Sequence, residues 1–573
     1  MLLVAAAIAA ALAAWALVTG GFRFHLFGIP ISVRGAHRAG VISLLLAAAG
    51  LGLHRSLREQ LGALTNRLPF ARTLPIVCAI AAVAVLVTAL KMGTRTAAGS
   101  DIYGYVSQAA LWRQGIPRIH QPIAAAVPWP DAEWTFAPLG YRPAPGQTIV
   151  PTYAPGLPLL MALFASVFGP GAEYFVVPIC GAVLVWLSYL LGRRVSSAAV
   201  GTIAALAIAT SPAILFMTLW SMSDVPVAVF WTASLLLACR QTRGASAGAG
   251  IAAGIAVLIR PNLAPLAIVP LAIAGLRGER RGRLARFAVY VLACAPFALF
   301  VGWLFDTWYG SPLRSGYGAA SDIYAVANVR PNTAKYIAWL WESQGPLPFA
   351  FPLALWLSRS RDDRIVRLAL AAFAAIVLAC YVAYIQFDVW WYVRFLIPAL
   401  PPMLVLGVDG IAGAAARFGP RVRIAVLLVV GLASTAFTVN ESVRRDVFSI
   451  GQGERKYEDV GRHVAEALPS NAAVYAVQHS GSIRHYSGRL TLRLDYMDPL
   501  WLDRSIAHMR AAGYEAYFVV DDWEVPAFVE RFRTQQTASL LALEPSTPRC
   551  THRTFVFRVA DRTVWRVPAR GCR

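Results

Sequence analysis

The stretch that decides the fold is LPIVCAIAAVAVLVTALKM, residues Leu74–Met92. It is an almost unbroken apolar run, and its length matches the roughly 20 residues that a helix needs to cross a hydrocarbon core of about 30 Å. Similar runs recur in both directions, from Leu2 to Phe437, and 57% of all residues are hydrophobic, 14% are charged and the mean hydropathy is +0.56. Water-soluble globular chains do not have this composition. The chain is therefore predicted to be an α-helical polytopic membrane protein.

About 13 membrane spans are expected, because apolar runs of roughly the required length recur along the chain. The first lacks the basic start and the small-residue cleavage site of a signal peptide, so we interpret it as a span. The expected spans are Leu2–Val18, Gly40–His54, Leu74–Met92, Ala172–Gly192, Val200–Thr218, Asp224–Cys239, Ala247–Ile259, Leu263–Leu276, Arg286–Phe305, Lys335–Leu357, Val366–Gln386, Phe395–Ala415 and Val422–Val439.

The formal net charge is +22, and many of the basic residues lie in short loops between expected spans. Alternate loops are far poorer in them, which is the pattern of cytoplasmic loops in membrane proteins. The amino terminus is then inside, and an odd number of spans places the carboxyl terminus outside. A nucleic-acid partner is not expected, because the charge is explained by topology. The basic loops carry Arg55, Arg58, Arg67 and Arg72; Arg193 and Arg194; Arg277, Arg280, Arg281, Arg283 and Arg286; and Arg359, Arg361, Arg364 and Arg367.

Three segments outside the spans are long enough to carry function. A large outer loop covers residues 93–171, and its apolar tail from Leu157 is expected to form an interfacial helix. A second outer segment runs from Asp306 to Asn332. The polar tail, residues 441–573, is expected to form a soluble extracytoplasmic α+β domain. Its expected helices are Asp459–Leu468 and Leu502–Ala512, and its expected buried strands are Ala473–Val477 and Ala516–Val520.

Two carboxylates stand at the outer ends of expected spans, where a charge needs a physical reason. Asp101 begins the large outer loop, with Tyr103, Tyr105 and Gln108 close behind it, and Asp224 begins a span. Both are candidates for catalysis. The alternative is that each only caps the amino terminus of a helix, a position that suits Ser-Asp pairs.

Two arginines on the outer side are equally unusual, Arg260 in Ile259-Arg260-Pro261-Asn262 and Arg394 in Trp390-Trp391-Tyr392-Val393-Arg394-Phe395. A guanidinium is a planar fork of donors that matches a phosphate, so a lipid-phosphate substrate would explain both. The alternative is that they snorkel to ordinary lipid headgroups. A further polar cluster, His479, Arg484, His485 and Arg489, lacks metal-ligand spacing and is interpreted as a structural or acceptor-binding loop.

The arrangement resembles the C-type superfamily of integral membrane glycosyltransferases, especially bacterial relatives of the protein O-mannosyltransferases and the lipid A aminoarabinose transferase. The resemblance covers roughly Lys91 to Pro402, and its motifs occur in family order. They are Asp101-Ile102-Tyr103 with Gln108, Tyr153-Ala154-Pro155-Gly156-Leu157-Pro158-Leu159-Leu160, Ser223-Asp224, Ile259-Arg260-Pro261-Asn262, Tyr309-Gly310-Ser311-Pro312-Leu313 and Arg394-Phe395-Leu396-Ile397-Pro398-Ala399-Leu400-Pro401.

The resemblance implies transfer of a sugar from a polyprenyl-phosphate donor to a hydroxyl of a lipid, glycan or protein acceptor, with inversion, at the outer face of a bacterial cytoplasmic membrane. It implies that Asp101 is the catalytic base and that Arg260 and Arg394 stabilise the departing phosphate. Asp224 matches a second acidic position that helps to hold the acceptor or a divalent cation. The expected substrate-binding residues are Tyr103, Tyr105, Gln108, Tyr153, Arg260, Asn262, Tyr309 and Arg394.

The chain also departs from that family. Two additional spans within residues 1–73 precede the expected transferase core, residues 74–440. Asp101 is followed by Ile102 instead of a second acidic residue, which leaves metal dependence open. A transporter or flippase of polyprenyl-linked lipids is the main rival, although the sequence lacks the two related halves typical of transporters. A non-catalytic scaffold of envelope glycan assembly is the other alternative.

Cys550 and Cys572 are predicted to form a disulfide. They are equidistant from Asp561, the middle of an expected turn between strands Thr554–Val559 and Thr563–Val567, and the compartment permits oxidation. Alkylation of the denatured, non-reduced protein is expected to leave both unlabelled, as mass spectrometry of the tail peptides would reveal. Labelling of both would establish the alternative, two free thiols.

Overall fold

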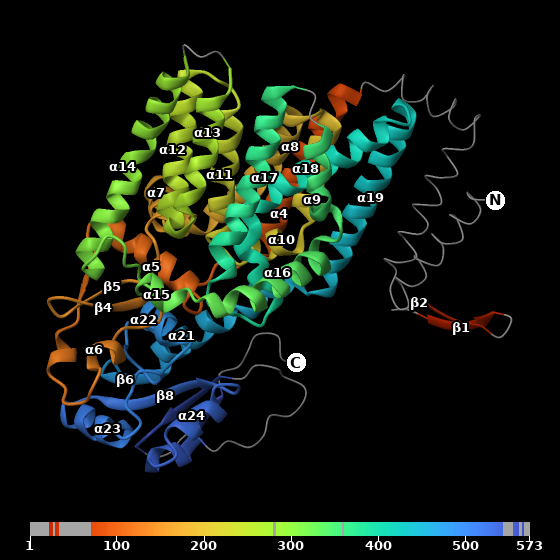
Figure 1. Ribbon diagram of the computed structural model, residues 1–573. Coiled ribbons are helices and arrows are strands. Elements are labelled where there is room, and N and C mark those ends of the chain that lie inside the picture. The colour runs from red at the N-terminus through yellow and green to blue at the C-terminus, as the bar shows by residue number, and fades with distance from the viewer. Residues whose placement is uncertain are drawn as a thin grey trace.

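The computed structural model describes residues 22–26, 29–33, 70–278, 282–357, 360–541, 554–560 and 564–566. Long helices form one bundle, and a layered domain with a β-sheet covers one end of it (Figure 1). A short antiparallel hairpin, β1 (Phe22–Leu26) with β2 (Ile29–Val33), was not expected from the sequence. The two additional spans expected at Leu2–Val18 and Gly40–His54 lie outside the described residues.

Among the described residues, 6 helices are long and apolar enough to cross a membrane, or 7 if one bent pair counts as a span. The multi-span helical membrane protein is therefore confirmed, whereas many of the expected crossings are shorter than one span. The bent pair, α9 (Ala198–Thr210) and α10 (Pro212–Leu219), turns by 54° where Pro212 cannot continue the hydrogen-bond ladder of α9. The long elements are α4 (Phe70–Met92), α8 (Val176–Val195), α14 (Arg283–Tyr309), α17 (Arg361–Val382), η7 (Trp390–Ala399) with α18 (Leu400–Ala416), and α19 (Pro420–Arg444).

Shorter apolar helices fill the spaces between the long ones. They are α11 (Asp224–Ala238), α12 (Arg243–Ile259), η3 (Pro261–Ala267) and α13 (Ile268–Leu276). The expected span Lys335–Leu357 is not one continuous helix, because the chain forms α16 (Val329–Gln344) and then η6 (Leu347–Leu357). Between them Gly345 has φ +69° and is followed by Pro346, and neither residue continues a helix.

The basic turns and the sheet lie at opposite ends of the bundle. Helix α14 begins at Arg283 and ends at Tyr309, whose hydroxyl donates to the carbonyl of Pro151 in the outer loop at 2.6 Å. A helix of that length separates its ends by about 40 Å. Helix α17 runs in the same direction, from Arg361 to the residues beside the outer segments (Figure 1).

The large outer loop is an ordered layer between the bundle and the sheet domain (Figure 1). Its helices are α5 (Asp101–Gln114), α6 (Ala132–Thr135) and α7 (Gly156–Phe168), and α7 exposes Leu163, Val167 and Phe168, as an interfacial helix requires. Its strands are β3 (Ile119–His120), β4 (Tyr141–Ala144) and β5 (Thr148–Pro151), in the order β3-β5-β4.

The carboxyl-terminal domain is built around a sheet in the order β10-β9-β8-β6-β7. Strands β6, β7 and β8 are parallel, with β7 at one edge of the sheet, and β9 and β10 add an antiparallel hairpin. All four expected helices and strands are confirmed within a few residues. The elements are α21 (Arg455–Ala467), β6 (Ala472–Ala476), α22 (Ser480–Ser487), β7 (Leu490–Arg493), α23 (Leu502–Ala511), β8 (Glu515–Asp521), α24 (Val525–Arg531), β9 (Thr554–Arg558) and β10 (Val564–Arg566).

This domain mixes helices and strands, as expected, and its helices lie on both faces of the sheet. Alternate residues of each strand face opposite sides, so Val474 and Val519 pack against α21 and α22, whereas Tyr475 and Phe518 pack toward α23 and α24. The expected hairpin is confirmed, with Phe557 opposite Val564. Cys550 and Cys572 lie outside the described residues, so their disulfide stays a prediction.

The residues His479–Arg489 join the sheet domain to the outer loop. Arg484 donates to the Phe136 carbonyl at 2.6 Å and to Gln121 Oε1 at 3.2 Å, both in the outer loop. Gly481 lies so close to the Tyr103 ring that an added Cβ would approach it to 2.2 Å. The sequence left open whether the cluster His479, Arg484, His485 and Arg489 is a structural loop or an acceptor-binding loop. The contacts of Arg484 and Gly481 agree with a structural loop.

Replacing Arg484 by alanine is expected to loosen the attachment of the sheet domain. Hydrogen bonds from a charged group contribute about 1.5–3 kcal/mol, and the buried acceptors would lose their donor. We expect a lower thermal midpoint of the detergent-solubilised protein and faster proteolysis between bundle and sheet. The matched control is Arg462→Ala, because its side chain is 62% exposed and pairs only with Glu458 on the same helix. Equal thermal midpoints and equal proteolysis rates of the two variants would contradict the role of Arg484 in attaching the sheet domain to the outer loop.

Candidate active site

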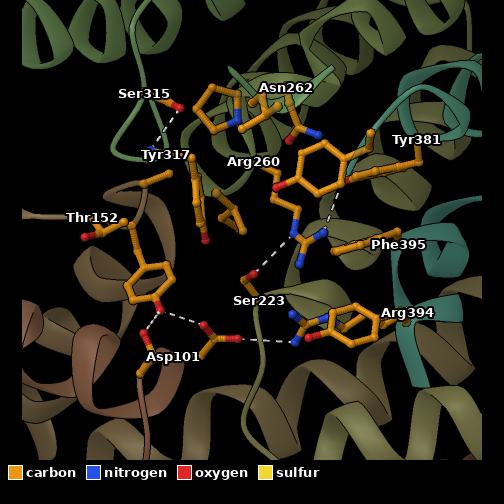
Figure 2. Close-up of a pocket in the computed structure, with 18 of the residues that line it drawn as sticks. Asp101, Thr152, Ser223, Arg260, Asn262, Ser315, Tyr317, Tyr381, Arg394 and Phe395 are labelled. Carbon is orange, nitrogen blue, oxygen red and sulfur yellow. Dashed lines mark hydrogen bonds and ion pairs between the residues drawn. The ribbon is translucent and has the colours of Figure 1, made fainter. Parts of the chain in front are cut away.

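A cavity of about 340 Å³ opens where the bundle meets the outer loop (Figure 2). Its lining comes from the start of α5, the turn between β5 and α7, the turns that follow α12 and α14, the end of α17, and η7. Side chains far apart in sequence therefore converge on one space. The polar lining residues are Ser100, Asp101, Tyr105, Thr152, Tyr153, Ser223, Arg260, Asn262, Ser315, Tyr317, Tyr324, Tyr381, Tyr384, Tyr392 and Arg394.

Close backbone contacts hold these turns together. An added Cβ at Gly156 would lie 2.4 Å from the backbone nitrogen of Ile259, which precedes Arg260. An added Cβ at Gly316 would lie 2.0 Å from the carbonyl oxygen of Thr152. Only glycine fits at either place, so the turns that carry Tyr153, Arg260 and Tyr317 touch through their backbones.

Asp101 is the first residue of α5, and its carboxylate points into the cavity. Tyr153 donates its hydroxyl to Asp101 Oδ1 at 2.6 Å, and Arg394 donates to Oδ2 at 3.3 Å (Figure 2). The side chain is 25% exposed, so one part of the carboxylate remains accessible from the cavity. The carboxylate bonds to side chains from other elements, and this geometry does not match the capping alternative.

The tyrosines around Asp101 are neutral proton donors. Burial raises the pKa of Tyr153 well above its ordinary value, and the negative charge of Asp101 raises it further. Burial also raises the pKa of Tyr105, with a smaller effect of the same sign from Asp101. Each phenol therefore keeps its proton, and Tyr153 remains a hydrogen-bond donor to Asp101.

Asp224 lies behind the cavity wall and pairs with Arg260. The distance between Asp224 Oδ1 and Arg260 Nη2 is 2.7 Å, and the Asp224 side chain is fully buried. Arg260 also donates to Ser223 Oγ at 3.2 Å and to Tyr381 Oη at 3.0 Å (Figure 2). A buried charge needs this compensation, so Asp224 holds and neutralises Arg260.

Phe395 lies between the two arginines. The guanidinium carbons of Arg260 and Arg394 are 5.5 and 5.3 Å from the centre of its ring, and Tyr381 stacks on the same ring at 4.7 Å. The arginine side chains are only 14% and 12% exposed. Both pair with carboxylates inside the protein, Arg260 with Asp224 and Arg394 with Asp101, so the snorkelling alternative does not describe them.

Three expected substrate-binding residues do not line the cavity. Tyr103 packs its ring against Gly481 of the sheet domain and near Tyr141. Gln108 is buried deeper along α5, with no hydrogen-bond partner for its amide among the described residues. Tyr309 donates to Pro151 and helps to hold the outer loop. The other expected site residues do line the cavity, except Asp224, which lies behind its wall. The residues that line it are Asp101, Tyr105, Tyr153, Arg260, Asn262 and Arg394.

Several aromatic lining residues, among them four tyrosines, were not among the site residues expected from the sequence. Tyr317 lines the cavity, with its ring centre 6.1 Å from that of Tyr153, and it lies in the second outer segment, Asp306–Asn332, to which no site residue was assigned except Tyr309. Tyr324, Tyr381 and Tyr384 occupy segments that resemble the ordinary aromatic belts of membrane proteins. The sequence feature that could have identified these tyrosines is their number in segments expected near the same surface of the membrane.

A third carboxyl group lies close to the site. Glu454 precedes α21 at the junction of bundle and sheet domain, and burial raises its pKa to about 7, against the effect of Lys456 and with that of Asp101.

The described residues contain no group of three or more His, Cys, Asp or Glu that could hold a metal ion. Divalent cations such as Mg²⁺ and Ca²⁺ prefer several oxygen ligands. Here Asp101 and Asp224 each face an arginine instead. This donor set does not fit a divalent cation.

Comparisons with known proteins point to one kind of enzyme. Residues 151–305 match the sequence profile of the family described as dolichyl-phosphate-mannose-protein mannosyltransferase. The matched segment includes the turns that carry Tyr153, Asp224 and Arg260. The resemblance to membrane glycosyltransferases is confirmed. No curated protein matches the chain significantly.

Solved structures of such glycosyltransferases share the fold. ArnT from Cupriavidus metallidurans in the apo state has 16% sequence identity and a TM-score of 0.51, over 80% of this chain and 95% of ArnT. ArnT bound to undecaprenyl phosphate has 14% identity and a TM-score of 0.51, over 81% and 95%. Archaeal AglB from Archaeoglobus fulgidus, in complex with an inhibitory peptide and a dolichol-phosphate, has 14% identity and a TM-score of 0.51, over 79% and 70%.

Replacing Asp224 by alanine is expected to destabilise the glycosyltransferase-like core. Arg260 would remain buried without its partner, and breaking one side of a buried ion pair costs about 3–5 kcal/mol. Thermal unfolding of the solubilised protein measures this loss. Asp388→Ala is the matched control, because Asp388 pairs with Lys335 but is 91% exposed, and we expect little change. A wild-type midpoint for Asp224→Ala would contradict the role of this pair.

Proposed function

We propose that this protein transfers a sugar from a polyprenyl-phosphate donor to a hydroxyl group of an acceptor at the membrane surface. The observation that supports it most directly is the presence of one accessible carboxylate, Asp101, and two nearly buried arginines in a single cavity. A carboxylate within reach of a hydroxyl suits general-base catalysis, and arginines suit a phosphate. Structures of ArnT bound to undecaprenyl phosphate and of AglB in complex with a dolichol-phosphate contain lipid phosphates of the same chemical class.

In this mechanism the donor phosphate binds at Arg394 and Arg260. Without donor, Arg394 pairs with Asp101 at 3.3 Å. An incoming phosphate competes for Arg394 and thereby frees one oxygen of Asp101. Substrate binding thus prepares the base.

The acceptor oxygen then attacks the anomeric carbon while its proton passes to the Asp101 carboxylate. The bond between that carbon and the phosphate oxygen breaks, and the electron pair leaves with the phosphate. The two arginines stabilise the charge that grows there. A single displacement inverts the anomeric configuration. Tyr153 holds Asp101 in place through its 2.6 Å hydrogen bond.

We also propose the topology. The arginine-rich ends of α14 and α17 are cytoplasmic, and the cavity and residues 441–573 lie on the outer side of a bacterial cytoplasmic membrane. Residues 74–440 form the transferase core, in which α11, α12 and α13 cross the membrane beside the longer helices. Residues 1–73 contribute two additional spans, for about 13 in all. The acceptor is a lipid, a glycan or a protein.

Asp101→Asn tests the proposed base. Asparagine keeps the size of the side chain but cannot accept the proton, so transfer from a labelled polyprenyl-phosphate sugar is expected to fall by about 10²–10⁴-fold. Binding of undecaprenyl phosphate, measured separately, is expected to persist because both arginines remain.

The control for this experiment is Asp388→Asn, an exposed carboxylate outside the cavity. If Asp101→Asn transfers sugar at the wild-type rate, the assignment of the base is wrong. If neither variant nor wild type transfers sugar from any polyprenyl-phosphate donor, the proposed function itself fails.

A further inference from the structure

A second cavity, of about 330 Å³, lies in the sheet domain. It is lined by residues that follow the three parallel strands: Val477 and Gln478 after β6, Leu494 and Asp495 after β7, and Trp523 and Glu524 after β8. Residues of α24 close its other side. The cavity is therefore at the carboxyl ends of the parallel strands.

The strand order gives this position a physical reason. The chain leaves β6 for β7 on one side, and then returns past β6 to β8 on the other. Successive crossovers thus run in opposite directions from β6 and leave a crevice at the strand ends. Ligands of open α/β sheets bind in crevices of this kind.

The polar groups of the crevice do not favour an ionic ligand. Asp495 pairs with Arg493, and Arg531 donates to the Met497 carbonyl at 2.9 Å. Glu524 accepts from the backbone nitrogens of Gln478 and Asp521 at 3.2 and 2.9 Å. The charged groups are engaged within the chain, so recognition depends on neutral groups and aromatic faces.

Trp523 offers such a face. Its indole nitrogen donates to the fully buried carboxylate of Asp521 at 3.2 Å, while 51% of the residue is exposed. The anchored ring is a rigid apolar surface beside the amide of Gln478. A flat ring with adjacent hydrogen-bonding groups suits a sugar, whose C–H face is apolar and whose hydroxyls are polar.

A series of side-chain contacts connects this crevice to the catalytic cavity. Tyr496, next to Asp495, stacks on Trp134 of the outer loop at 4.8 Å, and Arg142 lies over Trp134 at 5.3 Å. Arg142 then donates to the carbonyl of Gly316 at 2.7 Å, one residue before Tyr317 in the cavity lining. Tyr496 is 36% exposed and Tyr317 is 51% exposed.

We propose that the crevice at Trp523 and Gln478 binds a neutral oligosaccharide, and that this oligosaccharide is the distal part of the acceptor. The acceptor is then a glycan, which extends along Tyr496 and Trp134 to present its terminal hydroxyl at Asp101. The second half of the inference rests on the proposed transferase function. The first half, sugar binding in the sheet domain, does not.

The test uses the full-length protein in lipid nanodiscs and fluorescently labelled linear oligosaccharides of arabinose, galactose and mannose, with neutral peptides of similar size as competitors. Fluorescence anisotropy gives the affinities. Trp523→Ala and Trp523→Phe both lose the bond to Asp521, but only the first loses the aromatic face. We expect Trp523→Ala to bind about tenfold more weakly than Trp523→Phe. Phe418→Ala, an exposed aromatic residue in the turn between α18 and α19, is the control and keeps wild-type affinity.

The proposal is overturned if wild type binds none of the oligosaccharides, if Trp523→Ala and Trp523→Phe bind equally, or if the peptides bind and the sugars do not. The proposed function is tested separately with the same preparation. Sugar binding without any transfer would leave the crevice as a glycan site and reject the transferase. Transfer without sugar binding at Trp523 would reject only the crevice.

Discussion

The interaction on which the site depends is the pairing of two arginines with two carboxylates around one phenylalanine. Arg260 with Asp224 and Arg394 with Asp101 bring positive charge to the base of a cavity beside the apolar bundle. Unpaired charges at such a place would be costly. The pairs differ in one respect, because Asp224 is fully buried and Asp101 is 25% exposed. The first pair is therefore enclosed by protein, whereas the second is accessible from the cavity, and in the proposed mechanism Arg394 exchanges Asp101 for the donor phosphate.

The charged residues of the site could be recognised from the sequence because they interrupt an apolar background. The aromatic residues could not, since a tyrosine that lines a cavity and one in a membrane belt look alike. Tyr103 was expected to bind substrate with Asp101 and Tyr105, but helix geometry places it on a different face of α5 and away from the cavity. Positions 101 and 105 share one face of α5, whereas position 103 points away from it and meets Gly481 of a domain hundreds of residues later. Local periodicity contains no information about that partner.

The fold was predictable to a similar extent. Hydropathy indicated the helical membrane protein. Hydropathy averaged over a window does not detect a break at two residues, so α16 and η6 were predicted as one span across Gly345 and Pro346. The strands β6 and β8 were recognisable as apolar runs. Their order in the sheet was not, because it depends on crossovers that pack through two separate cores. The crevice at Trp523 follows from that order, and so it was invisible in the sequence.

The glycine contacts between the turns set the spacing of the cavity walls through backbone atoms, independently of the side chains that line the cavity. Gly156 against Ile259 and Gly316 against Thr152 set the spacing by backbone contact alone. The lining side chains other than Tyr153, which holds Asp101, can then be exchanged without changing the spacing of the turns that carry Tyr153, Arg260 and Tyr317. Under the proposed function, sugar preference can therefore diverge by substitution of the other lining tyrosines, while the spacing of these turns stays constant. Such a frame allows one reaction geometry to serve many sugars.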